Sequence, residues 1–321
     1  MTPEIFAEWM RRQGRRVVRT ESTYWHNQGW GAYQAFPYHW VIEPSEAELH
    51  QFVDDNRVLA LRYSAPVNSG SGCVSYHAVR DDANYDLNSL SQWARKNVRR
   101  GLRNCSIELI TFERLALEGW PLHRDTLDRQ GRREPGLSEK AWQAKCLTAG
   151  ELPGFQAWGA LVQNKLAASV ISFQMEDCCY LLDQQCERRH LGAHVSNALS
   201  FGVTRNLLTR PGVRSIFYAL QSLDAPACMD EFKFRMGYRA KPVRQQVVFH
   251  PWLSPMTNHV SHALLRLALK LRPGQPVLSK AEGMLRFYLQ GRLPAWRQIA
   301  PVSGMISPLN ESVVSRPPQP Q

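Results

Sequence analysis

The amino-acid sequence predicts an α/β fold in which a mixed sheet is flanked by helices. Three strands follow one another through tight turns over residues 155–185, and strands then alternate with helices as far as residue 249. Meandering strands pair antiparallel, whereas strands joined by helices pair in parallel, so the two patterns together predict a mixed sheet. The chain has 321 residues, of which 44% are hydrophobic, enough for one large domain or two smaller ones.

The first quarter of the chain contains short elements. Residues 23–38 are crowded with aromatic side chains and glycines, and we interpret them as a packed loop region. Ser45 and Glu48 stand at the spacing of a capping box, which predicts a short helix. Residues 58–63 and 73–79 are rich in strand-forming residues and are joined by a turn-forming segment, so we expect two strands there.

A basic helix follows these strands. Apolar residues recur at helical spacing over 90–102, and residues 106–110 alternate as a strand. The other face of this helix carries basic residues with no acid between them, namely Arg95, Lys96, Arg99, Arg100 and Arg103. Residues 112–150 have a helical pattern that is broken around Gly131 to Gly136. This part therefore leads from the first strands into the meander.

The second half of the chain has the strongest periodicity. The predicted strands are 155–162, 166–173, 178–185, 213–220 and 243–249, and the predicted helices between them are 191–207 and 227–236. Two amphipathic helices are then predicted over 258–271 and 279–289. We expect them to pack on the rest of the protein or on a partner subunit, or to lie on anionic lipid as basic amphipathic helices do. Residues 316–321 lack pattern and bulk, which predicts a disordered tail.

The composition limits the kinds of partner and location. The formal net charge of +11 favours an anionic partner such as coenzyme A, tRNA or an acidic membrane surface. No apolar run reaches the ~18 residues of a membrane span, and residues 1–19 lack the apolar core of a secretory signal. Seven irregularly spaced cysteines indicate neither a metal site nor a disulfide framework. We expect a location in the cytoplasm, or one peripheral to the inner face of the membrane.

Residues 184–194 are the most informative segment for function because they join a predicted strand to an apolar helix. Backbone amides at a helix N-terminus bind phosphate well, and a glycine such as Gly192 lets the chain approach a ligand closely. Cys186 lies near the same helix N-terminus, a position that lowers the pKa of a thiol, so it is a candidate nucleophile.

This segment resembles a motif of a known family. Residues 189–194, Arg-His-Leu-Gly-Ala-His, are similar to the [QR]-x-x-G-x-[GA] loop with which GNAT acyltransferases bind the coenzyme A pyrophosphate, although His194 replaces the final small residue. Residues 214–218 followed by 232–238 resemble the later strand, helix and Gly-aromatic signature of that family. The F-K-x-x-x-G spacing in 232–238 and the basic segment 95–102 also resemble Fem-type peptidyltransferases, tandem GNAT-like proteins that use aminoacyl-tRNA, and bacterial Fem-like acetyltransferases.

The resemblance implies tandem GNAT-like domains with a C-terminal helical extension. We expect a smaller first domain, degenerate or intact, over 1–105, an acyltransferase domain over 106–252, and amphipathic helices with the tail over 253–321. The implied activity moves an acyl group from acetyl-coenzyme A or another acyl-coenzyme A to an amine or sugar acceptor, either a small molecule or a cell-envelope precursor. The implied donor-binding residues are Arg189, Leu191, Gly192, Ala193 and His194.

Direct attack of an amine on a thioester needs a base for the ammonium proton and an acid for the leaving thiolate. Many GNAT enzymes have a tyrosine as the acid four residues before the terminal glycine, whereas this chain has Lys233, as the Fem-like pattern does. Lys233 is therefore either a residue that neutralises phosphate or developing charge, or an exposed helix lysine. Asp183 and Glu187 are candidate bases, and Tyr218 and Tyr238 are candidate acids.

Two other functions are consistent with the sequence. An aminoacyl-tRNA-dependent transferase of the Fem type is favoured by the basic segment 95–103 and by the net charge of the chain. A non-catalytic scaffold on a decayed acyltransferase fold is favoured by His194 and by the absence of a tyrosine at position 233.

Overall fold

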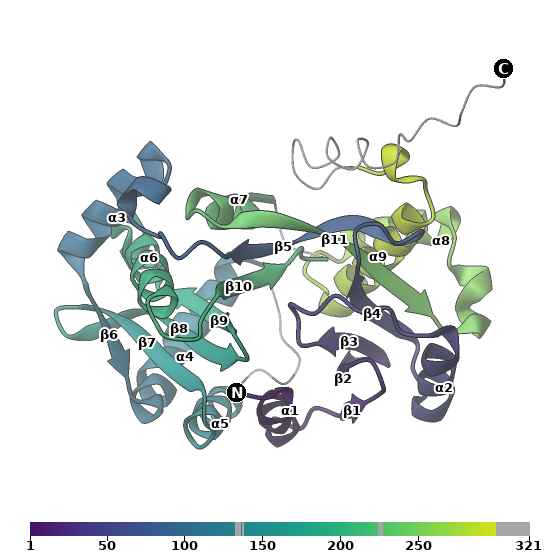
Figure 1. Cartoon of the computed structure of the whole chain (residues 1–321), viewed down its shortest axis with the longest axis horizontal. Coiled ribbons are helices and arrows are strands. Elements are labelled where there is room, and N and C mark those ends of the chain that lie inside the picture. Colours follow the sequence, from purple (N-terminus) through teal and green to yellow (C-terminus); the bar gives the residue numbers. More distant parts are fainter. Residues whose placement is uncertain (132–135, 137, 224–226, 300–321) are drawn as a thin grey trace.

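One sheet runs through the described part of the chain, which in this computed structural model comprises residues 1–131, 136, 138–223 and 227–299. Its strand order is β1-β2-β3-β4-β11-β5-β10-β9-β8-β7-β6 (Figure 1). The strands are β1 (Val17–Arg19), β2 (Tyr24–Gly29), β3 (Ala32–Phe36), β4 (Ala60–Ala65), β5 (Cys73–Arg80), β6 (Ser106–Ile110), β7 (Phe155–Val162), β8 (Lys165–Met175), β9 (Cys178–Cys186), β10 (Ser215–Leu220) and β11 (Arg239–Phe249). The predicted mixed α/β fold and every predicted strand from residue 58 onwards are confirmed.

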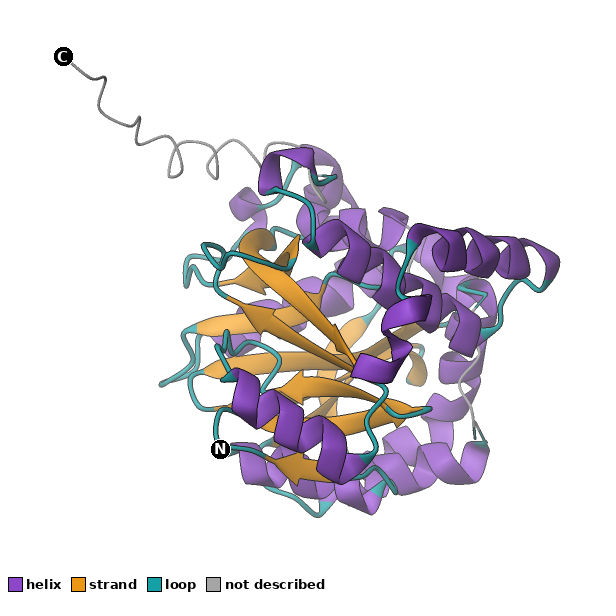
Figure 2. Ribbon diagram, turned by 90° about the vertical axis from the view of Figure 1, so that its right-hand side faces the viewer, coloured by secondary structure: helices purple, strands orange, loops and turns teal. Residues whose placement is uncertain are grey.

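Helices cover both faces of this sheet (Figure 2). They are α1 (Pro3–Arg12), α2 (Glu46–Asn56), α3 (Gln92–Asn104), α4 (Phe112–Arg129), α5 (Glu139–Gly150), α6 (Val195–Leu208), α7 (Ala227–Arg235), α8 (His259–Leu271) and α9 (Pro276–Gly291). Alternate residues of β8 point to opposite faces. Ile171 and Phe173 pack in a core with α1, α4 and α5, whereas Ala168 and Val170 pack in a second core with α3 and α6.

The interpretation of residues 23–38 as a packed loop is wrong, because β2 and β3 form a hairpin there. The side chains of Trp25 and Phe36 are fully buried, and both faces of the hairpin are covered by other parts of the protein. Burial on both faces removes the polar–apolar alternation that would reveal a half-exposed strand. Gly29, Trp30 and Gly31 adopt positive φ angles at the turn, which explains the glycines.

The two halves of the sheet exchange strands. β11, which comes late in the chain, lies between β4 and β5 and pairs antiparallel with both. β5 in turn pairs with β10 on its other side, so it joins the strands of 1–105 to those of 106–252. The predicted domain boundary at residue 105 stays a prediction, since one sheet contains strands from both sides of it.

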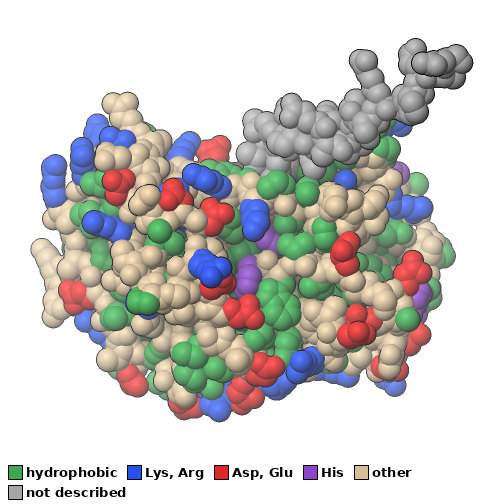
Figure 3. Space-filling view, viewed as in Figure 1, with side chains coloured by type: hydrophobic (Ala, Val, Ile, Leu, Met, Phe, Trp, Pro, Cys, Tyr) green, Lys and Arg blue, Asp and Glu red, His purple; other side chains and the backbone are tan. Residues whose placement is uncertain are grey.

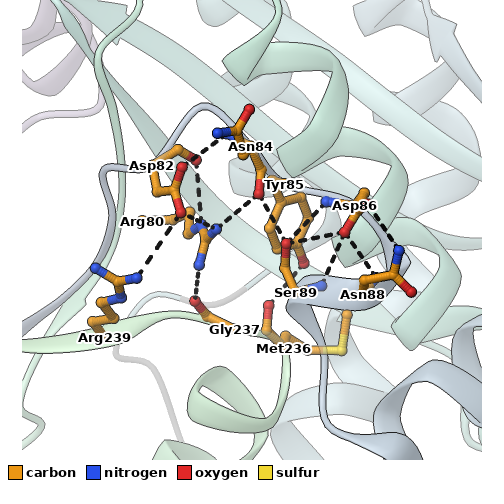
Figure 4. A network of polar contacts seen from close by, with 10 residues as sticks. All are labelled: Arg80, Asp82, Asn84, Tyr85, Asp86, Asn88, Ser89, Met236, Gly237 and Arg239. Atoms are coloured by element: carbon orange, nitrogen blue, oxygen red, sulfur yellow. Dashed lines mark hydrogen bonds and ion pairs between the residues drawn. The ribbon is translucent and has the colours of Figure 1, made fainter.

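A polar network fixes the chain where β5 leaves the sheet (Figure 4). Arg80 is buried, pairs with Asp82 at 3.0 Å and donates to the carbonyl oxygen of Gly237 at 3.2 Å. The hydroxyl of Tyr85 donates to the carbonyl oxygen of Met236 at 2.7 Å. These two hydrogen bonds hold the turn between α7 and β11 against the segment that leads to α3. Gly237 has a φ of 83° in this turn, and its Cα faces Tyr85, so a glycine suits this position.

The two C-terminal helices differ in burial. α9 packs on β11 and β5 through Met284, Leu285, Phe287 and Leu289, which are buried, whereas α8 buries no residue and contacts α9. Within the described residues no helix is both long and apolar enough to cross a bilayer. The predicted tail at 316–321 and most of the predicted break at 131–136 lie outside the described residues.

A buried hydrogen-bond chain crosses the exchanged strands. Arg62 Nε on β4 donates to Gln245 Oε1 on β11 at 2.9 Å, and Gln245 Nε2 donates to Ser64 Oγ at 2.6 Å. Ser64 Oγ lies 2.7 Å from His77 Nε2 on β5. The Ser64 oxygen accepts from Gln245 and keeps a second lone pair, so either Ser64 Oγ or His77 Nε2 is the donor of the bond between them. Burial lowers the pKa of His77 to about 3, so the imidazole is neutral in the folded protein at neutral pH.

Buried His77 makes the free energy of unfolding depend on pH. The unfolded protein binds the His77 proton near pH 6.5 and the folded protein only near pH 3, so unfolding is favoured as the pH falls through this window. Buried His26, whose pKa is also lowered to about 3, acts in the same direction. Each group contributes about 1.4 kcal/mol per pH unit below 6.5. We expect urea unfolding to show a steep loss of stability from pH 6.5 to 5, and His77→Gln to reduce that slope by at most about 1.4 kcal/mol per pH unit. An unchanged slope would contradict the assignment.

Candidate active site

Strands β9 and β10 run parallel but pair only near their beginnings. Their register joins Ser215 with Cys178 and ends at Phe217 with Tyr180. β9 nevertheless continues to Cys186 and β10 to Leu220, so the two strands separate at their carboxyl ends. The sheet is therefore open at this position although both strands keep their outer partners.

Both strands are irregular where they separate. The pairing of β9 with β8 shifts between Leu182 and Gln185, and Asp183 between them has a φ of 51°. The pairing of β10 with β5 shifts between Phe217 and Ala219, which leaves Tyr218 as the extra residue. Such bulges redirect side chains and are frequent beside active sites. Asp183 and Tyr218 are both turned into the gap by this irregularity.

The gap contains a cavity of about 450 Å³, and a second cavity of about 250 Å³ shares part of its wall. The larger cavity lies between the two halves of the sheet. Its wall comes from β9 and β10, from α4, from α7 through Lys233, from β3 and β4 through Gln34 and Arg62, and from α9 through Met284. This volume is in the range of small-molecule sites, and its wall carries convergent polar groups.

Two charged side chains of the wall are held by opposite charges. Lys233 is buried, and its Nζ lies 2.7 Å from Asp230 Oδ1 and 5.7 Å from the centre of the Tyr218 ring. Asp183 Oδ2 lies 2.6 Å from Lys145 Nζ on α5. Charges removed from water need such partners, and each pair fixes its side chain in one position. Of the two interpretations of Lys233, an exposed helix lysine is therefore wrong, because the side chain is buried in the cavity wall.

Tyr218 and Gln184 bridge the separated strands. The Tyr218 hydroxyl donates to Gln184 Oε1 at 2.8 Å, and Gln184 Nε2 donates to Ser196 Oγ in the first turn of α6 at 3.2 Å. Burial raises the pKa of Tyr218, so its hydroxyl carries a proton at neutral pH. A ligand that entered between the strands would meet this hydroxyl.

One buried amide atom of the cavity wall has no partner. Gln185 Nε2 lies 2.7 Å from His123 Nδ1, while Gln185 Oε1 has no hydrogen-bond partner among the described residues. Either orientation of the amide leaves one of its two polar atoms unpaired. Buried polar groups are normally satisfied, so an unpaired atom in a cavity wall is a natural contact for a bound ligand. Neither Gln185 nor His123 was predicted from the sequence.

The loop predicted to bind the donor lies outside the cavity. Residues Arg188–Ala193 form a short 3₁₀ helix, η2, and His194 has a φ of 60° immediately before α6. Arg189 is exposed and pairs with Glu187 at 2.9 Å. Gly192 is exposed, and a Cβ added to it would meet no atom within 4 Å. Leu191, Ala193 and His194 are partly buried beside it.

Helix α3 packs directly on this loop. A Cβ on Gly101 would lie 2.3 Å from the carbonyl oxygen of His194, and Asn104 Nδ2 donates to the carbonyl oxygen of Ala193 at 3.1 Å. Helix α3, which packs on the loop before α6, carries four exposed cations, namely Lys96, Arg99, Arg100 and Arg103. Figure 3 shows Lys and Arg side chains gathered at the end of the molecule where Figure 1 places α3. The predicted basic face and the predicted loop thus form one surface, which we call the basic surface.

Three other predicted residues lie away from the cavity. Glu187 caps η2 and pairs with Arg189 rather than lining the cavity. Tyr238 is buried in the core, where its hydroxyl lies 2.6 Å from Thr204 Oγ1 and burial raises its pKa well above the usual value. The expected low pKa of Cys186 is wrong, because burial raises the pKa of this thiol to about 12. The six cysteines with described side chains are all unpaired.

Known structures resemble this arrangement. FemX superimposes with a TM-score of 0.54 at 9% identity, over 78% of this chain and 93% of that one. The C-terminal domain of a protein assigned as a lysylphosphatidylglycerol synthetase from Agrobacterium fabrum gives a TM-score of 0.52 at 13% identity, over 85% and 92%. A conserved protein of unknown function from Bacteroides thetaiotaomicron gives 0.50 at 12% identity, over 76% and 88%.

No family model and no curated relative matches the chain. At identities of 9% to 13% these likenesses show the fold alone. The predicted family resemblance is confirmed at that level: the protein has a GNAT-like fold close to that of Fem-type proteins.

Proposed function

We propose that the protein transfers an acyl group from acyl-coenzyme A to an amine or sugar acceptor bound in the cavity. The observation that carries this proposal is the separation of β9 and β10, which brings Asp183, Tyr218 and Lys233 to one cavity from three elements. A carboxylate that can act as a base, a hydroxyl that can act as an acid and a cation around one space are the groups that acyl transfer needs. The fold, which acyltransferases share, supports the same conclusion.

In the proposed reaction the acceptor nitrogen or oxygen attacks the carbonyl carbon of the thioester. The new bond to carbon forms, the carbon–sulfur bond breaks, and coenzyme A leaves as a thiolate. Asp183 takes the proton that the acceptor loses, and Tyr218 gives its proton to the thiolate. Lys233 stabilises the negative charge that develops on the carbonyl oxygen. We assign no catalytic role to Glu187 or Tyr238, because neither lines the cavity.

The phosphates of the donor would lie on the basic surface. The start of α6 supplies the positive end of a helix dipole, Gly192 leaves open space beside it, and α3 supplies exposed cations. Ser196 in the first turn of α6 is hydrogen-bonded to Gln184, which in turn bonds Tyr218. A donor held at the start of α6 could therefore reach the cavity along the separated strands.

A second candidate is transfer from aminoacyl-tRNA. The exposed cations of α3 favour it, because a polynucleotide backbone needs more phosphate contacts than one pyrophosphate does. Both candidates use the same cavity and differ in the donor alone. They are separated by which donor binds the basic surface.

Gly192→Asp tests the donor site. The new side chain meets no neighbouring atom, so the fold should be unaffected, while its negative charge repels phosphate at the start of α6. We expect calorimetric titration to show affinity for acetyl-coenzyme A lowered at least ~10-fold. Gly70→Asp is the matched control, because Gly70 is also exposed with open space around it and should leave the affinity unchanged.

Unchanged affinity in Gly192→Asp would contradict the donor site. A parallel filter-binding assay with tRNA over a range of salt concentrations identifies the second candidate, which predicts a steep salt dependence and no binding of acetyl-coenzyme A. If neither donor binds the wild-type protein, the scaffold alternative is favoured and the transferase proposal fails.

Lys233→Met tests the catalytic site. We expect kcat to fall at least ~10-fold with little change in KM, because the charge acts on the transition state. The assay follows release of free coenzyme A from acetyl-coenzyme A with a panel of amines and amino sugars. Lys233→Arg should restore part of the rate by restoring the partner of Asp230, and exposed Lys241→Met should behave as wild type. A wild-type kcat in Lys233→Met would remove this residue from the mechanism.

A further inference from the structure

Helix α8 presents an apolar stripe to solvent. Val260, Leu264, Leu267 and Leu271 follow one another at intervals of four, three and four residues, which places them on one helix face. Each is between 53% and 75% exposed. Four adjacent exposed aliphatic side chains on one helix are unusual for a surface that faces water alone. The stripe therefore indicates an interaction surface.

The other side of α8 is accounted for. α8 packs against α9, and His262 Nε2 lies 2.8 Å from Glu282 Oε1 on that helix. Leu265 and Leu269 are half-buried on this inner side. The stripe is thus the outer face of a fixed helix, at the right-hand end of the molecule in Figure 1.

The segment directly before α8 in the chain also exposes large apolar side chains. Trp252 and Met256 lie in the 3₁₀ helix η3 (Pro251–Met256) and are 64% and 62% exposed. Tryptophan is enriched at the boundary between lipid and water, because its ring is apolar and its N–H is polar. Its position next to the stripe suits a lipid surface.

Along the chain, the charged residues on and next to the stripe are basic. No acidic residue occurs in the sequence from 251 to 281, whereas Arg266, Lys270 and Arg272 are exposed on or beside α8. Glu282, the nearest following acid, is mostly buried and paired with His262 and Arg286. Exposed Asp54 on α2 lies 4.0 Å from His250, whose ring contacts that of Trp252. An apolar helix face whose own helix carries cations and no acid is complementary to a bilayer with anionic headgroups.

We infer that α8 docks on the surface of an anionic lipid bilayer, with the stripe and Trp252 entering the headgroup boundary. The inference does not depend on the proposed reaction. It has a consequence for the cavity, because α9, on which α8 packs, contributes Lys280 and Met284 to the cavity wall. A protein docked through α8 would hold this wall beside the membrane surface.

The test is co-sedimentation of the full chain with vesicles of phosphatidylcholine alone and of phosphatidylcholine mixed with phosphatidylglycerol. We expect sedimentation with the mixed vesicles, weakened by salt, and little with the neutral ones. The double variant Leu264→Gln/Leu267→Gln should lower the partition at least ~10-fold, since two apolar side chains would no longer be transferred from water into the bilayer. Leu117→Gln on α4, equally exposed, is the matched control and should bind as wild type.

Three results would overturn the inference. The first is a wild-type protein that stays in the supernatant with both kinds of vesicle. The second is a double variant that sediments as well as wild type. The third is a dimer, seen by analytical ultracentrifugation, that the double variant abolishes, because the stripe would then be covered by a second copy of the chain.

Discussion

Strands β9 and β10 can separate without breaking the sheet because each keeps a partner on its outer side, β8 for β9 and β5 for β10. β5 can pair with β10 on one side because β11 pairs with it on the other side and joins it to β4. The exchange of strands therefore keeps the sheet continuous around an opening. The bulges that turn Asp183 and Tyr218 inward occur where the two strands stop pairing. The cavity and its polar groups all follow from this one constraint.

The charges of the cavity are organised before any ligand binds. Lys233 forms an ion pair with Asp230, and Asp183 on β9 forms an ion pair with Lys145 on α5. Positioned charges in a partly dry site act more strongly than the same charges in water and need little rearrangement during a reaction. The features that we propose to bind phosphate lie apart from them, on α3 and at the start of α6. A donor that spans both places would connect binding at one surface with chemistry in the cavity.

Local patterns in the sequence predict the meander, the basic helix and both C-terminal helices, because each is set by spacing along a few turns or strands. They do not predict the β2–β3 hairpin, which is buried on both faces, or the place of β11, which depends on pairing between distant segments. Asp183, Tyr218 and Lys233 were predicted and do line the cavity. His123 and Gln185 were missed because only the fold brings α4 to β9. Arg62 also lines the cavity and was not predicted to do so. The sequence does show it as a single charged residue in an otherwise apolar predicted strand.

We propose that acyl transfer takes place where β9 and β10 separate. A crystal structure with a non-hydrolysable analogue of acetyl-coenzyme A tests this proposal most directly. In this analogue a methylene group replaces the thioester sulfur, so the bond to the acyl carbon cannot break. We expect phosphates at the start of α6 beside Gly192, and an acyl end between Asp183 and Tyr218 within reach of Lys233. An analogue whose acyl end lies outside the cavity, with β9 and β10 still joined by Tyr218 and Gln184, would contradict it.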